Sequence, residues 1–163
     1  MTYGIWRILG IDPGIERLGW GVLIKNEGKF ERVNSGVKKT LKTQKQSERL
    51  FEIQCFLDEL IQNEKPDAVS VEKLFFAKNA KTALSISEAR GVILSTAQKH
   101  NLPISEFTPL QVKMAVCGYG KATKEDVARM LKLSMSLPQK NILDDETDAL
   151  AIALTGALHH RYP

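Results

Sequence analysis

The chain has 163 residues, of which 43% are hydrophobic and 26% are charged, as in an ordinary soluble globular protein of one domain. Lys and Arg number 23 against 19 Asp and Glu, and the net charge of +4 favours a polyanionic partner without identifying one. No apolar run approaches the ~18 residues that span a bilayer, no signal peptide opens the chain, and Cys55 and Cys117 form neither a CxxC motif nor a zinc site with the three histidines. We therefore expect a single cytoplasmic domain over residues 1–163, with no membrane segment and no disulfide framework.

The first quarter of the chain predicts three strands. A short apolar run ends in the turn signal Asp12-Pro13-Gly14, which suits a buried strand that stops at Asp12. Two further strands and a hairpin follow, and then a lysine-rich stretch that is typical of an exposed loop. The expected ranges are strands at 7–12, 18–24 and 30–37, a hairpin at 25–29 and a loop at 38–45.

The rest of the chain alternates helices with short strands. Leucines and isoleucines between Leu50 and Ile61 recur at three- and four-residue spacing, which predicts an amphipathic helix that ends before Pro66. Thr108-Pro109 and Thr123 are typical helix starts. The expected ranges are strands at 68–72 and 104–107 and helices at 79–100, 109–117, 124–133 and from 144 or 145 to about 159. This order predicts an α/β fold with one five-stranded mixed sheet and helices on both faces.

Four acidic side chains stand where such a fold gathers ligands, beyond the carboxyl ends of parallel strands. Asp12 and Glu72 each end a predicted buried strand. Asp145 and Asp148, three residues apart, share one face of the last helix, although Asp144 and Asp148 would share a face equally well. We expect these carboxylates to meet at one edge of the sheet.

Converging carboxylates suit a divalent cation better than they suit packing. Mg²⁺ prefers hard oxygen ligands, and two ions ~3.5–4 Å apart can activate water and stabilise a leaving oxygen in phosphodiester cleavage. Without a cation the carboxylates would repel one another and their pKa values would rise.

Each acid also has a structural alternative. Asp12 before Pro-Gly is a common turn residue, and Glu72 is placed to pair with Lys73. The Asp144–Asp148 segment is a good helix start, with an aspartate cap and acids facing the helix dipole. The occurrence of all these features together, in this order, favours the metal site.

Several motifs of the chain resemble those of the RuvC family, the bacterial Holliday junction resolvases or crossover junction endodeoxyribonucleases. The resemblance runs from about Ile8 to His159. It is carried by Gly-Ile-Asp-Pro-Gly at 10–14, Val-Glu-Lys-Leu-Phe-Phe-Ala-Lys-Asn-Ala at 71–80, Ala-Arg-Gly-Val at 89–92, Gln-Val-Lys at 111–113 and Asp-Glu-Thr-Asp-Ala-Leu-Ala-Ile-Ala at 145–153.

The resemblance implies a ribonuclease H-like fold and a homodimer that makes paired symmetric nicks in a four-way DNA junction. It implies that Asp12, Glu72, Asp145 and Asp148 are the catalytic metal ligands, with Asp144 as an alternative to Asp145. The implied cofactor is two Mg²⁺ ions per subunit, with Mn²⁺ as a substitute, and the products carry 5′-phosphate ends. The RuvA–RuvB branch-migration complex is the implied protein partner.

Aromatic and basic residues are the candidate DNA contacts. The resemblance implies that Phe75 stacks on an unpaired base and that Lys113 and Lys124 lie near the scissile phosphate. The residues themselves suggest the same chemistry, because aromatics interleaved with Lys78 and Lys81 suit exposed bases and phosphates. The alternatives are that a neighbouring phenylalanine, which we take to be Phe76, fills the core and that the lysines line a solvated loop.

A stripe of mostly small residues runs along the helix expected at 79–100. Such a face permits close approach to the helix's own sheet or to a second subunit, and the resemblance favours the dimer. The stripe consists of Ala80, Leu84, Ser87, Gly91 and Leu94.

Two other functions fit part of the pattern. A catalytically silent junction-binding module would keep the basic and aromatic residues but lose some acids, whereas all four positions are acidic here. An actin-like phosphotransferase also carries Asp-x-Gly after its first strand, but it needs two such domains and a second phosphate loop, and 163 residues supply one domain.

Overall fold

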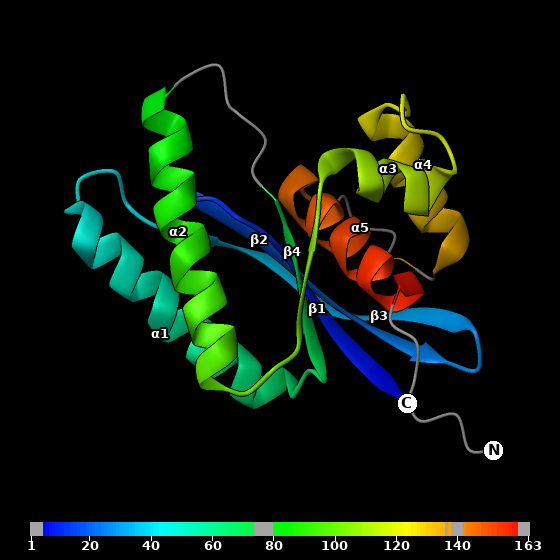
Figure 1. Cartoon of the computed structure of the whole chain (residues 1–163), viewed down its shortest axis with the longest axis horizontal. Helices are drawn as coiled ribbons and strands as arrows, with labels where there is room; N and C mark the ends of the chain where they lie inside the picture. Colours follow the sequence, from blue (N-terminus) through cyan, green and yellow to red (C-terminus); the bar gives the residue numbers. More distant parts are fainter. Residues whose placement is uncertain (1–4, 74–79, 136, 138–141, 160–163) are drawn as a thin grey trace.

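A five-stranded mixed sheet runs through the centre of the protein in the computed structural model, which describes residues 5–73, 80–135, 137 and 142–159 (Figure 1). The strand order is β3-β2-β1-β4-β5, with antiparallel pairing of β1 with β2 and of β2 with β3, and parallel pairing of β1 with β4 and of β4 with β5. The strands are β1 (Trp6–Asp12), β2 (Arg17–Asn26), β3 (Lys29–Lys39), β4 (Ala68–Glu72) and β5 (Ile104–Phe107). The mixed sheet expected from the sequence is confirmed.

Helices cover both faces of this sheet, as predicted (Figure 1). Along β1 the side chains alternate: Ile8 packs with α3, α4 and α5, whereas Leu9 and Ile11 pack with α1 and α2. The helices are α1 (Gln46–Glu64), α2 (Ala80–Lys99), α3 (Pro109–Cys117), α4 (Lys124–Ser134) and α5 (Asp144–His159). In the described ranges, no helix has both the length and the apolar character needed to cross a membrane.

Helix α5 lies directly on the sheet because glycines on β1 and β2 leave room for its backbone. A Cβ atom on Gly10 would overlap the backbone of Ala149 and Ala153, and one on Gly19 would overlap the backbone of Asp145. Every residue from 149 to 157 is buried. This close packing fixes the height and the rotation of the acidic first turn of α5 over the ends of the central strands.

Local signals for helix ends are confirmed. The hydroxyl groups of Thr108 and Thr123 accept hydrogen bonds from the backbone N–H of Gln111 and Asp126, as N-caps do. Gly118 ends α3 in the left-handed region.

One boundary differs from the expectation. Strand β3 continues to Lys39, into the stretch expected as a loop, because Lys38 and Lys39 pair with Leu18 and Arg17 of β2. The β2 strand begins at Arg17, one residue earlier than expected. Pairing with this longer neighbour therefore outweighs the lysine-rich composition of the segment.

Candidate active site

Asp12 and Glu72 are neighbours at the carboxyl ends of β1 and β4. The parallel register pairs Ile11 with Val71, so the next residue on each strand is the acid. Both acids lie two residues after a position that contacts α5, namely Gly10 on β1 and Ser70 on β4. Because alternate residues of a strand share a face, both carboxyl groups belong to the face that α5 covers.

The first two turns of α5 bring Asp145 and Asp148 to the same edge. The two residues are three apart and so lie on one face of the helix. The contact of Gly19 with the Asp145 backbone places this turn beside Asp12, since Gly19 pairs with Asp12 in the β1–β2 register. Three elements, β1, β4 and α5, thus supply the four predicted acids to one region.

The electrostatics of the cluster are unfavourable to free carboxylates. Burial raises the pKa of Asp12 to about 8, and the charges of Glu72, Asp148 and Asp145 contribute to this rise, while Lys124 lowers it. The pKa of Glu72 is also raised, by burial first and then by the charge of Asp148. Ionised Asp12 and Glu72 therefore lack sufficient positive charge nearby, and a divalent cation would supply it.

Basic side chains hold the other two acids. Lys124 Nζ lies 3.0 Å from Asp148 Oδ2, and this contact raises the pKa of the lysine. Arg17 contacts Asp145 Oδ2 through Nε at 2.6 Å and Nη2 at 2.5 Å. In this arrangement no three acidic, histidine or cysteine side chains of the described residues converge tightly enough to hold one ion. The all-oxygen donor set fits Mg²⁺, but the carboxylates must turn toward a shared ion to bind it.

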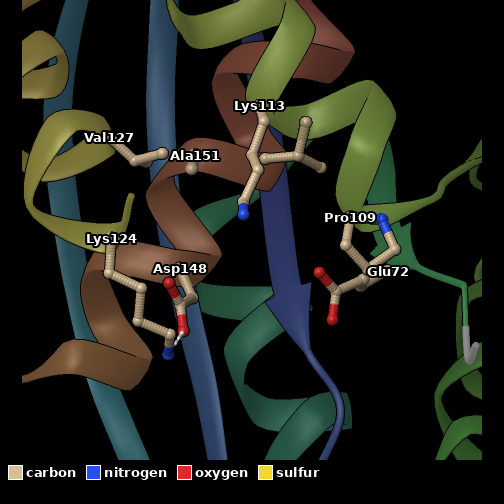
Figure 2. A pocket seen from close by; sticks show the side chains of 8 residues that line it. Glu72, Pro109, Lys113, Lys124, Val127, Asp148 and Ala151 are labelled. Atoms are coloured by element: carbon tan, nitrogen blue, oxygen red, sulfur yellow. Dashed lines mark hydrogen bonds and ion pairs between the residues drawn. The ribbon is translucent and has the colours of Figure 1, made fainter. Parts of the chain in front are cut away.

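A pocket of about 290 Å³ opens beside these acids (Figure 2). Figure 2 shows the carboxyl groups of Glu72 and Asp148 on opposite sides of the pocket, with the Lys113 ammonium group pointing into the space between them. Lys124 reaches Asp148 from α4. The apolar part of the wall comes from Pro109, Val112, Val127 and Ala151. The pocket combines acids with two lysines, as a site for a cation and a phosphate requires.

Comparison with known proteins identifies the family. Residues 8–156 match the family described as Crossover junction endodeoxyribonuclease RuvC. The chain belongs to the RuvC family. It is 47% identical over 152 residues to the RuvC of Prochlorococcus marinus (strain NATL2A), covering 92% of this chain and 97% of the relative. It is 49% identical over 146 residues to the RuvC of Petrotoga mobilis, covering 90% of each.

Solved structures agree with this assignment. T. thermophilus RuvC in complex with a Holliday junction substrate matches with a TM-score of 0.87 at 36% identity, covering 93% of each chain. The yeast mitochondrial resolvase Ydc2 matches with a TM-score of 0.69 at 17% identity, covering 95% of this chain and 79% of the other, which shows a shared fold alone. The ribonuclease H-like fold that the resemblance implied is therefore confirmed.

In this RuvC-family chain, the structure bears on two alternatives to metal binding: helix capping by the acids at 144–148 and an ion pair between Glu72 and Lys73. Glu146 is the acid that caps the start of α5, because its carboxylate accepts hydrogen bonds from the Leu143 N–H at 3.2 Å and from the Ser35 hydroxyl at 2.8 Å. The capping interpretation thus describes Glu146 and leaves Asp145 and Asp148 for the site. Among the described residues, Glu72 forms no ion pair with Lys73.

Part of the predicted DNA surface lies outside the described residues. Phe75, Phe76 and Lys78 fall in the 74–79 segment, and Lys81 belongs to α2 but its side chain is not described. Lys113 and Lys124 are the two predicted lysines that the structure places beside the acids.

Arg17 belongs to the site but is not among the residues predicted from the sequence. This arginine is the only basic side chain that the described residues place on Asp145. A signal was present: Arg17 alternates with Gly19 and Gly21, so it shares the strand face on which α5 packs. An arginine two residues before a pair of alternating glycines on this face marks a position beside the first turn of α5.

Three residues of the small-residue stripe on α2, namely Leu84, Ser87 and Gly91, face outward. Leu84 is 62% exposed, Ser87 and Gly91 are exposed, and a Cβ on Gly91 would meet nothing within 4 Å. The helix packs on its own domain through a different face, formed by Ala89, Ile93 and Ala97. Leu94 also packs against this core, so packing within the domain accounts for that end of the stripe but not for Leu84, Ser87 and Gly91.

Proposed function

We propose that this chain is an endonuclease that cuts four-way DNA junctions by metal-assisted hydrolysis of phosphodiester bonds, in a single nuclease domain over residues 1–163. The observation that carries the proposal is the raised pKa of Asp12, which is caused by its burial and by the charges of Glu72, Asp148 and Asp145 at the same edge of the sheet. A catalytically silent module would have no need of so unfavourable a cluster. Family membership and the T. thermophilus relative bound to a Holliday junction substrate support junction DNA as the substrate.

Asp12, Glu72, Asp145 and Asp148 would hold the metal, which we propose to be two Mg²⁺ ions per subunit with Mn²⁺ as a substitute. The ions would supply the activation of water and the neutralisation of charge on the leaving 3′ oxygen, so that the products carry 5′-phosphates. The chain's own part is to orient these oxygens from three rigid elements and to exclude bulk water with the apolar wall of the pocket.

The two lysines of the pocket would bind the DNA backbone. The Lys113 ammonium points into the space between Glu72 and Asp148, where a phosphate would approach the acids (Figure 2). Lys124 pairs with Asp148, and a bound cation would release it to contact a phosphate. Phe75, Lys78 and Lys81 would extend this surface, with Phe75 stacking on an unpaired base.

A homodimer would account for symmetric cutting. A four-way junction offers two equivalent strands, and a two-fold dimer presents two identical sites to them. The outward stripe on α2, with exposed Leu84 and open Gly91, is the face we propose for the contact. The RuvA–RuvB complex as a partner and a cytoplasmic location belong to the same proposal.

The test is incubation of the protein with a synthetic four-way junction and Mg²⁺. We expect paired nicks at symmetric positions, no nicks in a duplex of the same sequence, and products that a ligase seals without prior phosphorylation. ATP hydrolysis is measured in the same preparation, because an actin-like phosphotransferase would turn over ATP. Turnover of ATP without nicking of the junction would contradict the proposal.

A further inference from the structure

Arg17 stands on the same strand face as the glycines that receive α5. It opens β2, two residues before Gly19, and Gly19 touches the backbone of Asp145. Because alternate residues share a face, the Arg17 side chain extends toward the first turn of α5. The fold therefore brings a guanidinium to an acid 128 residues away in the chain.

The contact uses only one of the two carboxylate oxygens. Nε and Nη2 of Arg17 both contact Asp145 Oδ2, at 2.6 and 2.5 Å. Within the described part of the chain, no hydrogen bond or ion pair engages Asp145 Oδ1. Asp144, the adjacent acid, is exposed and does not take part in this contact with Arg17. One oxygen of Asp145 is thus fixed and the other stays available.

We propose that Arg17 is a positioning residue of the metal site: it holds Asp145 by Oδ2, leaves Oδ1 for the cation, and so makes Asp145 rather than Asp144 the ligand from this turn. The inference rests on the proposed function. Carboxylates that bind metals are commonly oriented by such a hydrogen-bond donor, and loss of the donor weakens metal binding or activity by about 10–100-fold. The rigid fork of an arginine suits this role better than the flexible ammonium of a lysine.

A purely electrostatic role would have the opposite sign. A positive guanidinium beside a cation site repels the cation, and an arginine that merely competed for Asp145 would also have to be displaced. In either case removal of Arg17 would strengthen metal binding. A positioning role predicts that removal weakens it.

The experiment is titration of the full-length protein with Mn²⁺, with free Mn²⁺ followed by electron paramagnetic resonance. We expect Arg17→Gln to weaken Mn²⁺ binding by about 10–100-fold, and Arg17→Lys to recover part of the loss. Arg129→Gln is the matched control, because Arg129 also pairs with an aspartate, Asp126 at 3.3 Å, on the exposed surface of α4. Its Mn²⁺ affinity should stay within about twofold of the parent, as surface pairs contribute little.

Unchanged or tighter Mn²⁺ binding by Arg17→Gln would overturn the inference and leave the proposed function standing. Absence of Mn²⁺ binding by the parent protein would overturn the proposed function and the inference together. If Arg17→Gln does not fold, Asp145→Asn and Asp144→Asn provide the test. The first should weaken Mn²⁺ binding and the second should not, and equal effects would overturn the choice of Asp145.

Discussion

Gly19 of β2 lies under the first turn of α5, where the backbone of Asp145 leaves no room for a side chain. A Cβ at residue 19 would lie 2.1 Å from the Asp145 carbonyl oxygen, whereas ordinary contact begins at 3.4 Å. In Gly19→Ala the turn that carries Asp145 and Asp148 must therefore retreat from Asp12 by about 1 Å. A displacement of this size in an active site can cost about 100-fold in rate, and overpacking costs about 1–3 kcal/mol of stability.

The control is Gly28→Ala, in the hairpin between β2 and β3. Gly28 has a φ of 80° with nothing within 4 Å of its added Cβ, so alanine there strains the backbone without a clash. Its cost of about 1–2 kcal/mol is comparable, but it acts at the opposite end of β2 from Gly19 and the acidic first turn of α5. Urea unfolding gives the stabilities, and junction nicking at saturating Mg²⁺ gives the rates. We expect about 100-fold slower nicking in Gly19→Ala alone. Equal nicking rates in the two variants would refute the idea that the packing of α5 on the sheet determines the positions of the acids in the site.

Four further predictions follow from the site and the surfaces around it. Asp148→Asn should slow junction nicking by about 100-fold or more while gel-shift affinity for the junction is kept, because Asp148 is proposed as a metal ligand and not as a DNA contact. Without divalent cations the folded protein holds a proton on Asp12 up to about pH 8 that the unfolded chain releases near 3.8, so stability falls as pH rises between these values. In thermal melts, Mg²⁺ should therefore raise the melting temperature more near the upper end of this pH range than near its middle. An equal rise at both pH values would contradict the raised pKa of Asp12. Leu84→Lys should convert a dimer into a monomer in sedimentation while circular dichroism shows that the chain stays folded, since this side chain is 62% exposed in the single chain. Phe75→Ala should reduce junction cutting more than duplex binding, and equal losses would argue against stacking.

The sequence predicted elements whose signals are local. The caps at Thr108 and Thr123 and the end of α3 before Gly118 involve neighbours within a few residues, and the structure confirms them. The end of β3 was missed, because Lys38 and Lys39 become strand through pairing with β2, and composition alone does not reveal a partner strand.

The sequence predicted which acids gather at the candidate site, but it did not predict that Arg17 pairs with Asp145. Asp12 and Glu72 follow buried strands, and parallel strands align their carboxyl ends, so their meeting could be expected from the pattern. The contact between Arg17 and Asp145 joins residues 128 positions apart and depends on α5 resting on Gly19. The alternation of Arg17 with Gly19 and Gly21 marks the strand face, but which acid meets the arginine is decided by the packing of α5.

The most direct measurement is a crystal structure of the protein soaked in Mn²⁺, with the ions located by their anomalous scattering. We expect ions at the carboxyl ends of β1 and β4, bound by oxygens of Asp12, Glu72, Asp148 and Asp145, with Arg17 still on Asp145 Oδ2. Ions bound elsewhere, with these four carboxylates left without metal, would contradict this expectation.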